Sequence, residues 1–267
     1  MPSSPLYGRP TGSARHTPSR RLFPSWLRTL AVLVGLMVLA VAVTVLLVAQ
    51  SGDRAVREPD DRSRAAQGVL DQRPQPTGYP SAGAGRFLTA GEASPVHGLD
   101  GPVVRYRVAV EQGTGQDPAG FAAEVDAVLS DPRSWIGSGE LRVQRVAEFD
   151  RADFTVYLAT PLTSEAMCAE GGLSTEGYTS CRLPGQVIIN LARWLEAVPD
   201  YGAPLEVYRA YVINHEVGHE FGQWHEECPG PGRPAPVMQQ QTYGLAGCLA
   251  NAWPYLDGHR YAGDLVP

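Results

Sequence analysis

A string of three histidines constrains this chain more than any other feature. Residues 215–225 read His-Glu-Val-Gly-His-Glu-Phe-Gly-Gln-Trp-His. Side chains four positions apart lie on one face of a helix, so His215 and His219 can bind a single ion together. Neutral imidazole nitrogens in a tetrahedral arrangement suit zinc. The spacing therefore predicts a Zn²⁺ site on a helix.

His225 can join the same ion only if the helix ends after His219. Ten further residues of helix would carry His225 roughly 15 Å along the axis and onto another face. Gly222 can reverse the chain, because glycine adopts a left-handed backbone without steric cost and commonly ends helices. Glu216 follows the first ligand, where a carboxylate can reach a metal-bound water without being a ligand itself. We therefore predict His215, His219 and His225 as metal ligands and Glu216 as a general base.

The beginning of the chain predicts a membrane anchor. Residues 1–28 contain five arginines and no acidic residue, which indicates a disordered basic cytoplasmic tail. Residues 30–49 carry no charge and are long enough to span a bilayer as a helix, so we assign residues 29–50 to a transmembrane signal anchor. The basic tail should stay in the cytoplasm, which places the rest of a single-pass protein outside the cell membrane. A cleaved signal peptide is the alternative, but its apolar core would be shorter.

Residues 51–85 are rich in Arg, Asp, Gln, Pro and Gly and predict a flexible linker. Residues 86–267 remain for one folded domain, enough for a single core. Beyond the basic tail, 17 basic residues face 28 acidic ones. This balance disfavours nucleic acid as a partner.

The cysteines number four, and all of them lie beyond the predicted anchor. An even number in an exported domain predicts two disulfides. Three pairings are possible, and we favour the local one, Cys168 with Cys181 and Cys228 with Cys248. The alternative makes Cys228 a fourth metal ligand, but a catalytic zinc needs an open coordination position.

In order, the predicted domain has a strand, a helix, three further strands and the metal-binding helix, and we expect an α+β fold. A capping acid followed by proline at Asp117-Pro118 predicts the start of one helix. The metal-binding helix should begin near Pro204 and be buried, because apolar residues surround most of it. Tyr208 and Tyr211 on this helix are expected to be core or rim aromatics. The predicted strands span residues 103–111, 141–146, 154–159 and 186–190.

The last of these strands, residues 186–190, leaves two interpretations open. At the edge of the sheet, it could pair with an extended peptide by β-augmentation. Inside the sheet, it would bind no ligand.

The string from His215 to His225 resembles the signature of the metzincin clan of zinc peptidases. Met238, in Pro236-Val237-Met238-Gln239, is similar to the methionine turn of that clan. The whole arrangement resembles an uncharacterised family of membrane-anchored actinobacterial proteins. The resemblance implies a metzincin-like zincin domain, with a twisted mixed sheet, a backing helix and the zinc helix beneath a cleft.

This chain departs from some members of the clan at Gln240 and matches the astacin-like branch at Glu226. Some members of the clan place a tyrosine two residues after the methionine, where this chain has Gln240, and the nearest tyrosine is Tyr243. We assign neither residue a catalytic role. Glu226 follows the third histidine as in the astacin-like branch, where this residue forms a structural salt bridge, so we interpret it as structural or simply exposed.

These features predict an extracytoplasmic, membrane-anchored zinc metalloendopeptidase. Glu216 would activate a zinc-bound water for attack on a peptide bond of a protein or peptide substrate. One alternative keeps the site but changes the substrate to cell-wall peptide or amide bonds. Another is a non-catalytic, zinc-containing binding domain.

Overall fold

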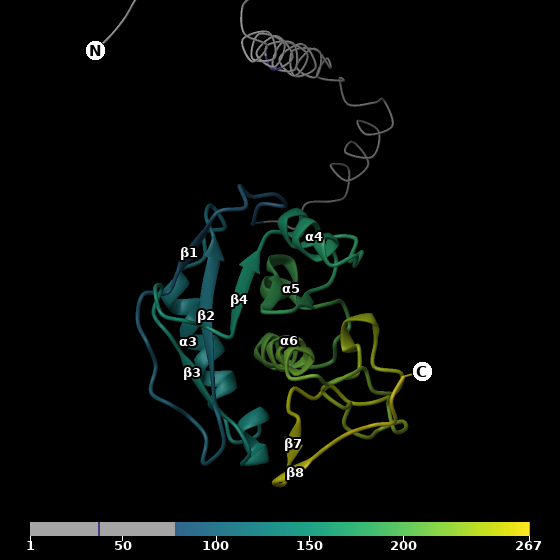
Figure 1. The fold of residues 1–267 in the computed structure, drawn as a ribbon. Helices are drawn as coiled ribbons and strands as arrows, with labels where there is room; N and C mark the ends of the chain where they lie inside the picture. The colour runs from purple at the N-terminus through teal and green to yellow at the C-terminus, as the bar shows by residue number, and fades with distance from the viewer. Residues whose placement is uncertain (1–36, 38–77, 267) are drawn as a thin grey trace, which may run out of the picture. The chain divides into compact units, whose positions relative to one another are not determined.

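The computed structural model describes residue 37 and residues 78–266. Figure 1 shows the chain as a ribbon with its elements labelled. In chain order the elements after residue 78 are β1 (Phe87–Thr89), β2 (Val103–Glu111), α3 (Pro118–Leu129), η1 (Trp135–Ser138), β3 (Arg142–Arg145), β4 (Phe154–Ala159), α4 (Pro161–Glu170), β5 (Cys181–Leu183), β6 (Gln186–Asn190), α5 (Leu191–Glu196), α6 (Leu205–Glu220), η2 (Gln241–Tyr243), β7 (Tyr255–Leu256) and β8 (His259–Arg260).

The main sheet of the described residues has six strands, in the order β1-β2-β4-β6-β5, with β3 also paired to β2. Strands β2, β4 and β6 run parallel to one another, whereas β1 and β5 run antiparallel to their neighbours. The prediction of an α+β fold with a mixed sheet is therefore confirmed. Parallel strands need covered connections, and helices α3 and α4 supply them on the chain from β2 to β6.

Strand β4 shows why both faces of this sheet are covered. Successive side chains of a strand point to opposite faces. Val156 and Leu158 belong to the main core, which also receives α3, α5 and α6, whereas Tyr157 and Ala159 contact a smaller apolar cluster that contains Cys168 of α4. In Figure 1, α6 lies between the sheet and the loops drawn in yellow-green.

The predicted elements are found close to their expected positions. Strands β2, β4 and β6 have the predicted bounds, and β3 is shorter by one residue at each end. The Asp117 carboxylate caps α3 by accepting a hydrogen bond from the Gly120 backbone N–H at 2.9 Å. Helix α6 begins directly after Pro204, as expected. Both disulfides have the predicted local pairing, Cys168–Cys181 and Cys228–Cys248.

Strand β6 is an interior strand, paired with β4 on one side and with β5 on the other. The interpretation of residues 186–190 as an edge strand is therefore wrong. The edge belongs to β5, a strand of only three residues that sequence periodicity did not indicate. Three residues are too few to show an alternating pattern.

Helices α4 and α5 were also absent from the predicted elements. Helix α4 mixes Thr, Ser, Glu and Cys with few large apolar residues, so its sequence lacks a clear apolar stripe. Helix α5 has six residues and follows β6 without a loop, because Asn190 ends the strand and its side chain caps the helix at the Ala192 N–H.

The predicted tail and transmembrane segment, residues 1–28 and 29–50, lie outside the described residues except for residue 37. Within the described part of the chain, no helix is both long and apolar enough to cross a membrane. The compact unit that contains the sheet spans Pro74–Pro267. Residues 78–85, which precede the predicted domain boundary at residue 86, contribute to it, since the buried Tyr79 donates a hydrogen bond to Glu196 at 2.9 Å.

Helix α6 is anchored through Asn214, the residue before the first histidine. The Asn214 side chain is fully buried; its Oδ1 accepts from the Ser134 hydroxyl at 2.7 Å and its Nδ2 donates to the Ala252 carbonyl at 2.9 Å. The Trp135 indole donates to the Asn214 carbonyl at 2.9 Å. These bonds tie the middle of α6 to two distant loops.

We expect Asn214→Ala to destabilise the protein by about 2–4 kcal/mol, because it leaves buried partners without a hydrogen bond. Urea unfolding followed by circular dichroism measures this loss. Gln144→Ala removes a partly buried amide that makes one side-chain hydrogen bond, and serves as the control. Equal losses in the two variants would contradict the anchoring role of Asn214.

Candidate metal centre

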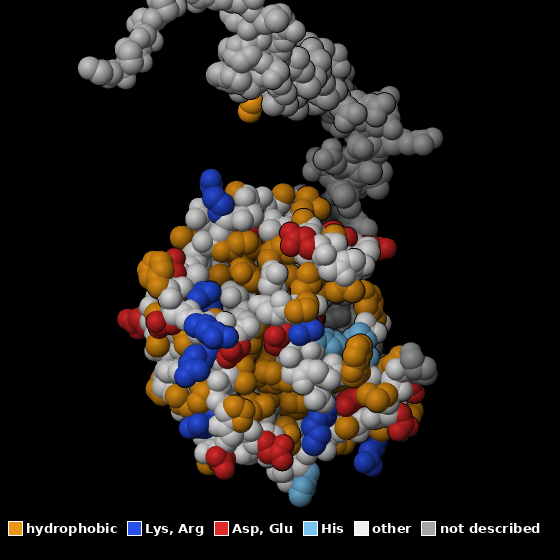
Figure 2. Space-filling view, viewed as in Figure 1, with side chains coloured by type: hydrophobic (Ala, Val, Ile, Leu, Met, Phe, Trp, Pro, Cys, Tyr) orange, Lys and Arg blue, Asp and Glu red, His pale blue; other side chains and the backbone are white. Residues whose placement is uncertain are grey.

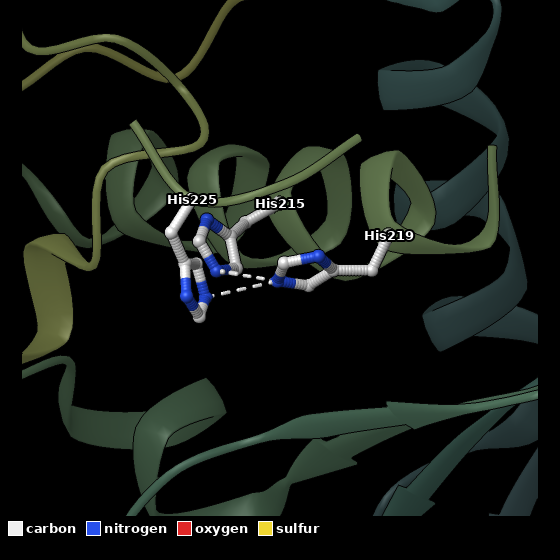
Figure 3. Close-up of side chains that lie close together, drawn as sticks. All are labelled: His215, His219 and His225. Atoms are coloured by element: carbon white, nitrogen blue, oxygen red, sulfur yellow. Dashed lines mark hydrogen bonds between the residues drawn. The ribbon is translucent and has the colours of Figure 1, made fainter. Parts of the chain in front are cut away.

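The three predicted ligands come from α6 and from the loop that follows it. Helix α6 ends at Glu220, and Gly222 adopts a φ of 80°, the left-handed conformation that the sequence predicted for the reversal. His225 thereby returns to the face of α6 that carries His215 and His219. Figure 3 shows the three rings converging.

The ring nitrogens of the histidines are spaced for one metal ion. His219 Nε2 lies 3.2 Å from His215 Nε2 and 3.1 Å from His225 Nε2, the contacts dashed in Figure 3. One candidate ligand atom from each residue lies within 4.8 Å of the others. Tetrahedral zinc with bonds of about 2.0–2.1 Å separates its ligand nitrogens by about 3.3 Å. The cluster therefore has the dimensions of a metal site.

Two of the rings present lone pairs to each other. His215 Nδ1 lies 2.8 Å from the Val237 carbonyl, and His219 Nδ1 lies 2.8 Å from the Gln223 carbonyl. A carbonyl only accepts, so each Nδ1 carries the hydrogen and each neutral ring has a bare Nε2. Two lone pairs about 3 Å apart repel each other unless a cation lies between them. This tautomer is the one that metal-binding histidines adopt.

Burial keeps these rings neutral. It lowers the pKa of His215 to about 3, with His219 adding to the effect, and lowers the pKa of His225 to about 4. Burial also lowers the pKa of His219, against the effect of its hydrogen bond to Gln223. Neutral imidazole is the form that binds metal.

Glu216 lies on the same cavity as the three histidines. This cavity has a volume of about 360 Å³, and Glu216, which is 6% exposed, is one of its lining residues. Burial raises the pKa of Glu216 to about 8. Among the described residues, no hydrogen-bond donor engages its carboxylate. A cation bound by the histidines would favour the charged carboxylate again.

Met238 packs against α6 at Gly218, which lies between His215 and His219 in the chain. Its side chain is fully buried, and a Cβ placed on Gly218 of α6 would lie 2.5 Å from the Met238 sulfur. The adjoining backbone binds both ligand segments: the Val237 carbonyl accepts from His215, and the Met238 carbonyl accepts from the Glu226 N–H at 3.1 Å. The turn therefore connects the helix to the loop that carries His225.

Several side chains at the mouth of the cavity were given no functional role by the sequence. Trp224, 75% exposed, lies between two ligands in the chain. Arg182 comes from the edge strand β5 and forms an ion pair with Glu220 at the end of α6. No sequence periodicity indicates either residue, because Trp224 lies in a loop and Arg182 lies in a three-residue strand. Gln240 and Tyr243 also line the cavity. Figure 2 shows histidine side chains reaching the surface beside hydrophobic ones.

The remaining predictions concern the tyrosines, Glu226 and Cys228. Tyr208 and Tyr211 are both fully buried core residues, although Tyr211 also lines the cavity. Glu226 is structural rather than exposed: it is 6% exposed and pairs with Arg260 at 2.7 Å. The alternative of Cys228 as a metal ligand is wrong, because its sulfur is bonded to Cys248.

A comparison with protein families matches residues 73–252 to the model described as "Protein of unknown function (DUF3152)". The chain belongs to this family. The segment that matches DUF3152 includes all three histidines, Glu216 and Met238. No curated protein and no solved structure matches the chain.

The lowered histidine pKa values predict metal binding that resists acid. For a histidine with an ordinary pKa near 6.5, the neutral fraction falls about 10-fold between pH 7.5 and pH 5.5. Here the rings stay neutral until the pH falls toward their lowered pKa values. We expect the Zn²⁺ affinity to change by less than about 10-fold between pH 7.5 and 5.5. Competition with a chelator of known pH dependence measures it, and a loss near 1000-fold would show ordinary histidines.

We expect Gly218→Ala to destabilise the protein by about 1–3 kcal/mol, because the new methyl group overpacks the contact with Met238. Gly120→Ala in α3 is the control, since its Cβ would meet no atom closer than 3.4 Å. There, replacing a helical glycine should be neutral or stabilising. Urea unfolding of both variants measures the difference, and equal effects would show that the space at Gly218 is not tight.

Proposed function

We propose that the protein is a zinc-dependent metallopeptidase with a metzincin-like domain, anchored in the membrane by residues 29–50 and acting outside the cytoplasm. The observation that carries this proposal is the single cavity lined by three converging histidines and the buried carboxylate of Glu216. The two disulfides support an oxidising compartment.

The open side of the site favours an enzyme over a non-catalytic zinc domain. Structural zinc sites are usually closed by four protein ligands, whereas catalytic sites keep one position for water or substrate. Among the described residues, the ligand cluster contains three candidates, and the cavity continues beside them. A domain that only held zinc would gain nothing from a buried carboxylate at this cavity, because burying a charge without a partner is costly.

The edge strand supports an extended peptide as the substrate. Strand β5 is the last strand of the sheet, and its residues Cys181 and Arg182 line the cavity. A peptide could add to this edge by main-chain hydrogen bonds and pass over the histidines. Exposed apolar side chains at the cavity, Leu173, Trp224 and Tyr243, would then contact apolar side chains of the substrate.

In the proposed mechanism, His215, His219 and His225 would hold a zinc ion, with their Nε2 atoms facing one another. Bound zinc would supply Lewis acidity, polarising a carbonyl and lowering the pKa of water. The Glu216 carboxylate accepts a proton from a water molecule in the cavity as that water attacks the peptide carbonyl. Glu216 then donates the proton to the leaving amine. The hydrogen bonds to Val237 and Gln223 keep the first two rings in the tautomer and orientation that this role requires.

We expect Glu216→Gln to lower the rate of peptide cleavage by about 10²–10⁴-fold while zinc stays bound, because the variant loses the general base but keeps all three ligands. The measurement is cleavage of a diverse peptide library by the full-length protein, with the zinc content determined for each variant. Glu206→Gln, an exposed residue in the first turn of the same helix, is the matched control.

The outcomes separate the candidate functions. Cleavage that survives in Glu216→Gln would contradict the assigned base. Zinc-loaded protein that cuts no linear peptide, but cuts cross-linked cell-wall peptides in a Glu216-dependent way, would shift the substrate class. Zinc without any turnover would indicate a binding domain.

A further inference from the structure

The loop of the third histidine lies beside a segment that is distant in the chain. Residues 264–266 pair antiparallel with residues 225–227, and we call the segment that they end, residues 257–266, the strap. The Val266 N–H donates to the His225 carbonyl at 3.0 Å, and the Glu227 N–H donates to the Asp264 carbonyl at 2.8 Å. Glu226 and Leu265 form an antiparallel bridge between these two hydrogen bonds. The strap therefore pairs with the backbone of the ligand itself.

The same three-residue loop is held on its other side by the methionine turn. There the Glu226 N–H donates to the Met238 carbonyl at 3.1 Å. The loop is thus hydrogen-bonded on one side to the methionine turn and on the other to the strap.

His225 depends on this pairing more than the other ligands do. The rings of His215 and His219 are each oriented by a hydrogen bond from Nδ1 to a carbonyl. Among the described residues, the His225 ring has no such partner, and its polar contact is with His219 Nε2 at 3.1 Å. The backbone at residue 225 must therefore determine where the His225 nitrogen lies.

A buried ion pair attaches the strap to the ligand loop. Arg260 Nη2 lies 2.7 Å from Glu226 Oε1, and the Glu226 side chain is 6% exposed. The other Glu226 oxygen is also buried. Removing Arg260 would leave a buried carboxylate without a charged partner, which is strongly destabilising for the segment that carries it.

At Gly263 the strap packs closely against the ligand loop and Pro236. A Cβ on Gly263 would lie 2.1 Å from the Glu227 carbonyl oxygen and 3.0 Å from Pro236. A side chain at this position therefore cannot be accommodated without moving the strap or the ligand loop.

We propose that the strap, through Arg260 and Gly263, positions His225 as the third metal ligand, and that without it the centre is reduced to the two ligands of α6. Arg260 is a positioning residue, since it acts through Glu226. This inference rests on the proposed metal site but not on peptide cleavage.

The test compares Arg260→Met with Arg145→Met in the full-length protein. Arg145 of strand β3 forms a similarly buried ion pair with Asp126 of helix α3, and controls for the loss of such a pair. Zn²⁺ dissociation constants come from chelator competition, and the visible absorption of bound Co²⁺ reports the number and geometry of its ligands. Thermal unfolding of the metal-free variants records any general loss of stability.

We expect Arg260→Met to weaken Zn²⁺ binding by about 10–100-fold and to change the Co²⁺ spectrum, while Arg145→Met changes neither. Arg260→Lys, which retains a cation for Glu226, should recover most of the affinity and the wild-type spectrum. Wild-type affinity and spectrum in Arg260→Met would overturn the proposal. Equal weakening in Arg145→Met would also overturn it, because the effect would then be general destabilisation.

A second pair of variants serves if Arg260→Met fails to fold. Gly263→Ala should weaken metal binding, whereas Gly91→Ala, where a Cβ would meet no atom within 4 Å, should not. Equal metal binding in both variants would overturn the positioning role. Wild-type protein that binds Zn²⁺ without cleaving peptides would refute the proposed peptidase and leave this inference standing. Wild-type protein that binds neither metal would refute both.

Discussion

The repulsion between bare imidazole nitrogens is the constraint on which the rest of the site depends. His215 and His219 donate their Nδ1 hydrogens to carbonyls, so their Nε2 lone pairs converge within 3.2 Å. A fold maintains such an arrangement only if contacts elsewhere fix the position of the rings. In this chain the contacts come from the buried helix α6, from the methionine turn packed against it and from the loop that reverses at Gly222. Each of these elements has other contacts that fix it independently of the rings.

Helix α6 is the element that makes most of these contacts. Asn214 ties its middle to the loops around Ser134 and Ala252, and Glu220 ties its end to Arg182 of the edge strand. Gly218 provides the space for Met238. The helix is therefore fixed on several sides before any ion is considered. This rigidity is what a site that must hold three ligands in one geometry requires.

Much of the secondary structure could be predicted from local sequence patterns. The strands of residues 103–111 and 154–159, the cap at Asp117 and the start of α6 after Pro204 all follow from periodicity and capping within a few residues. Both disulfides close short loops, so the local pairing was the natural expectation. Strand β5 and helices α4 and α5 were missed because they are short or lack an apolar stripe, and their formation depends on neighbours that the local sequence does not reveal.

The sequence by itself predicted the candidate ligands, the candidate base and the reversal at Gly222, because helical spacing and glycine conformation are local properties. The uncharged, apolar run of residues 30–49 likewise predicts a membrane-spanning segment from the sequence alone. Only the tertiary structure decided which strand forms the edge beside the cavity, and that Glu226 is buried against Arg260. It alone brought the strap to His225, since pairing between segments about 40 residues apart depends on how the intervening chain folds and leaves no periodic mark in the sequence.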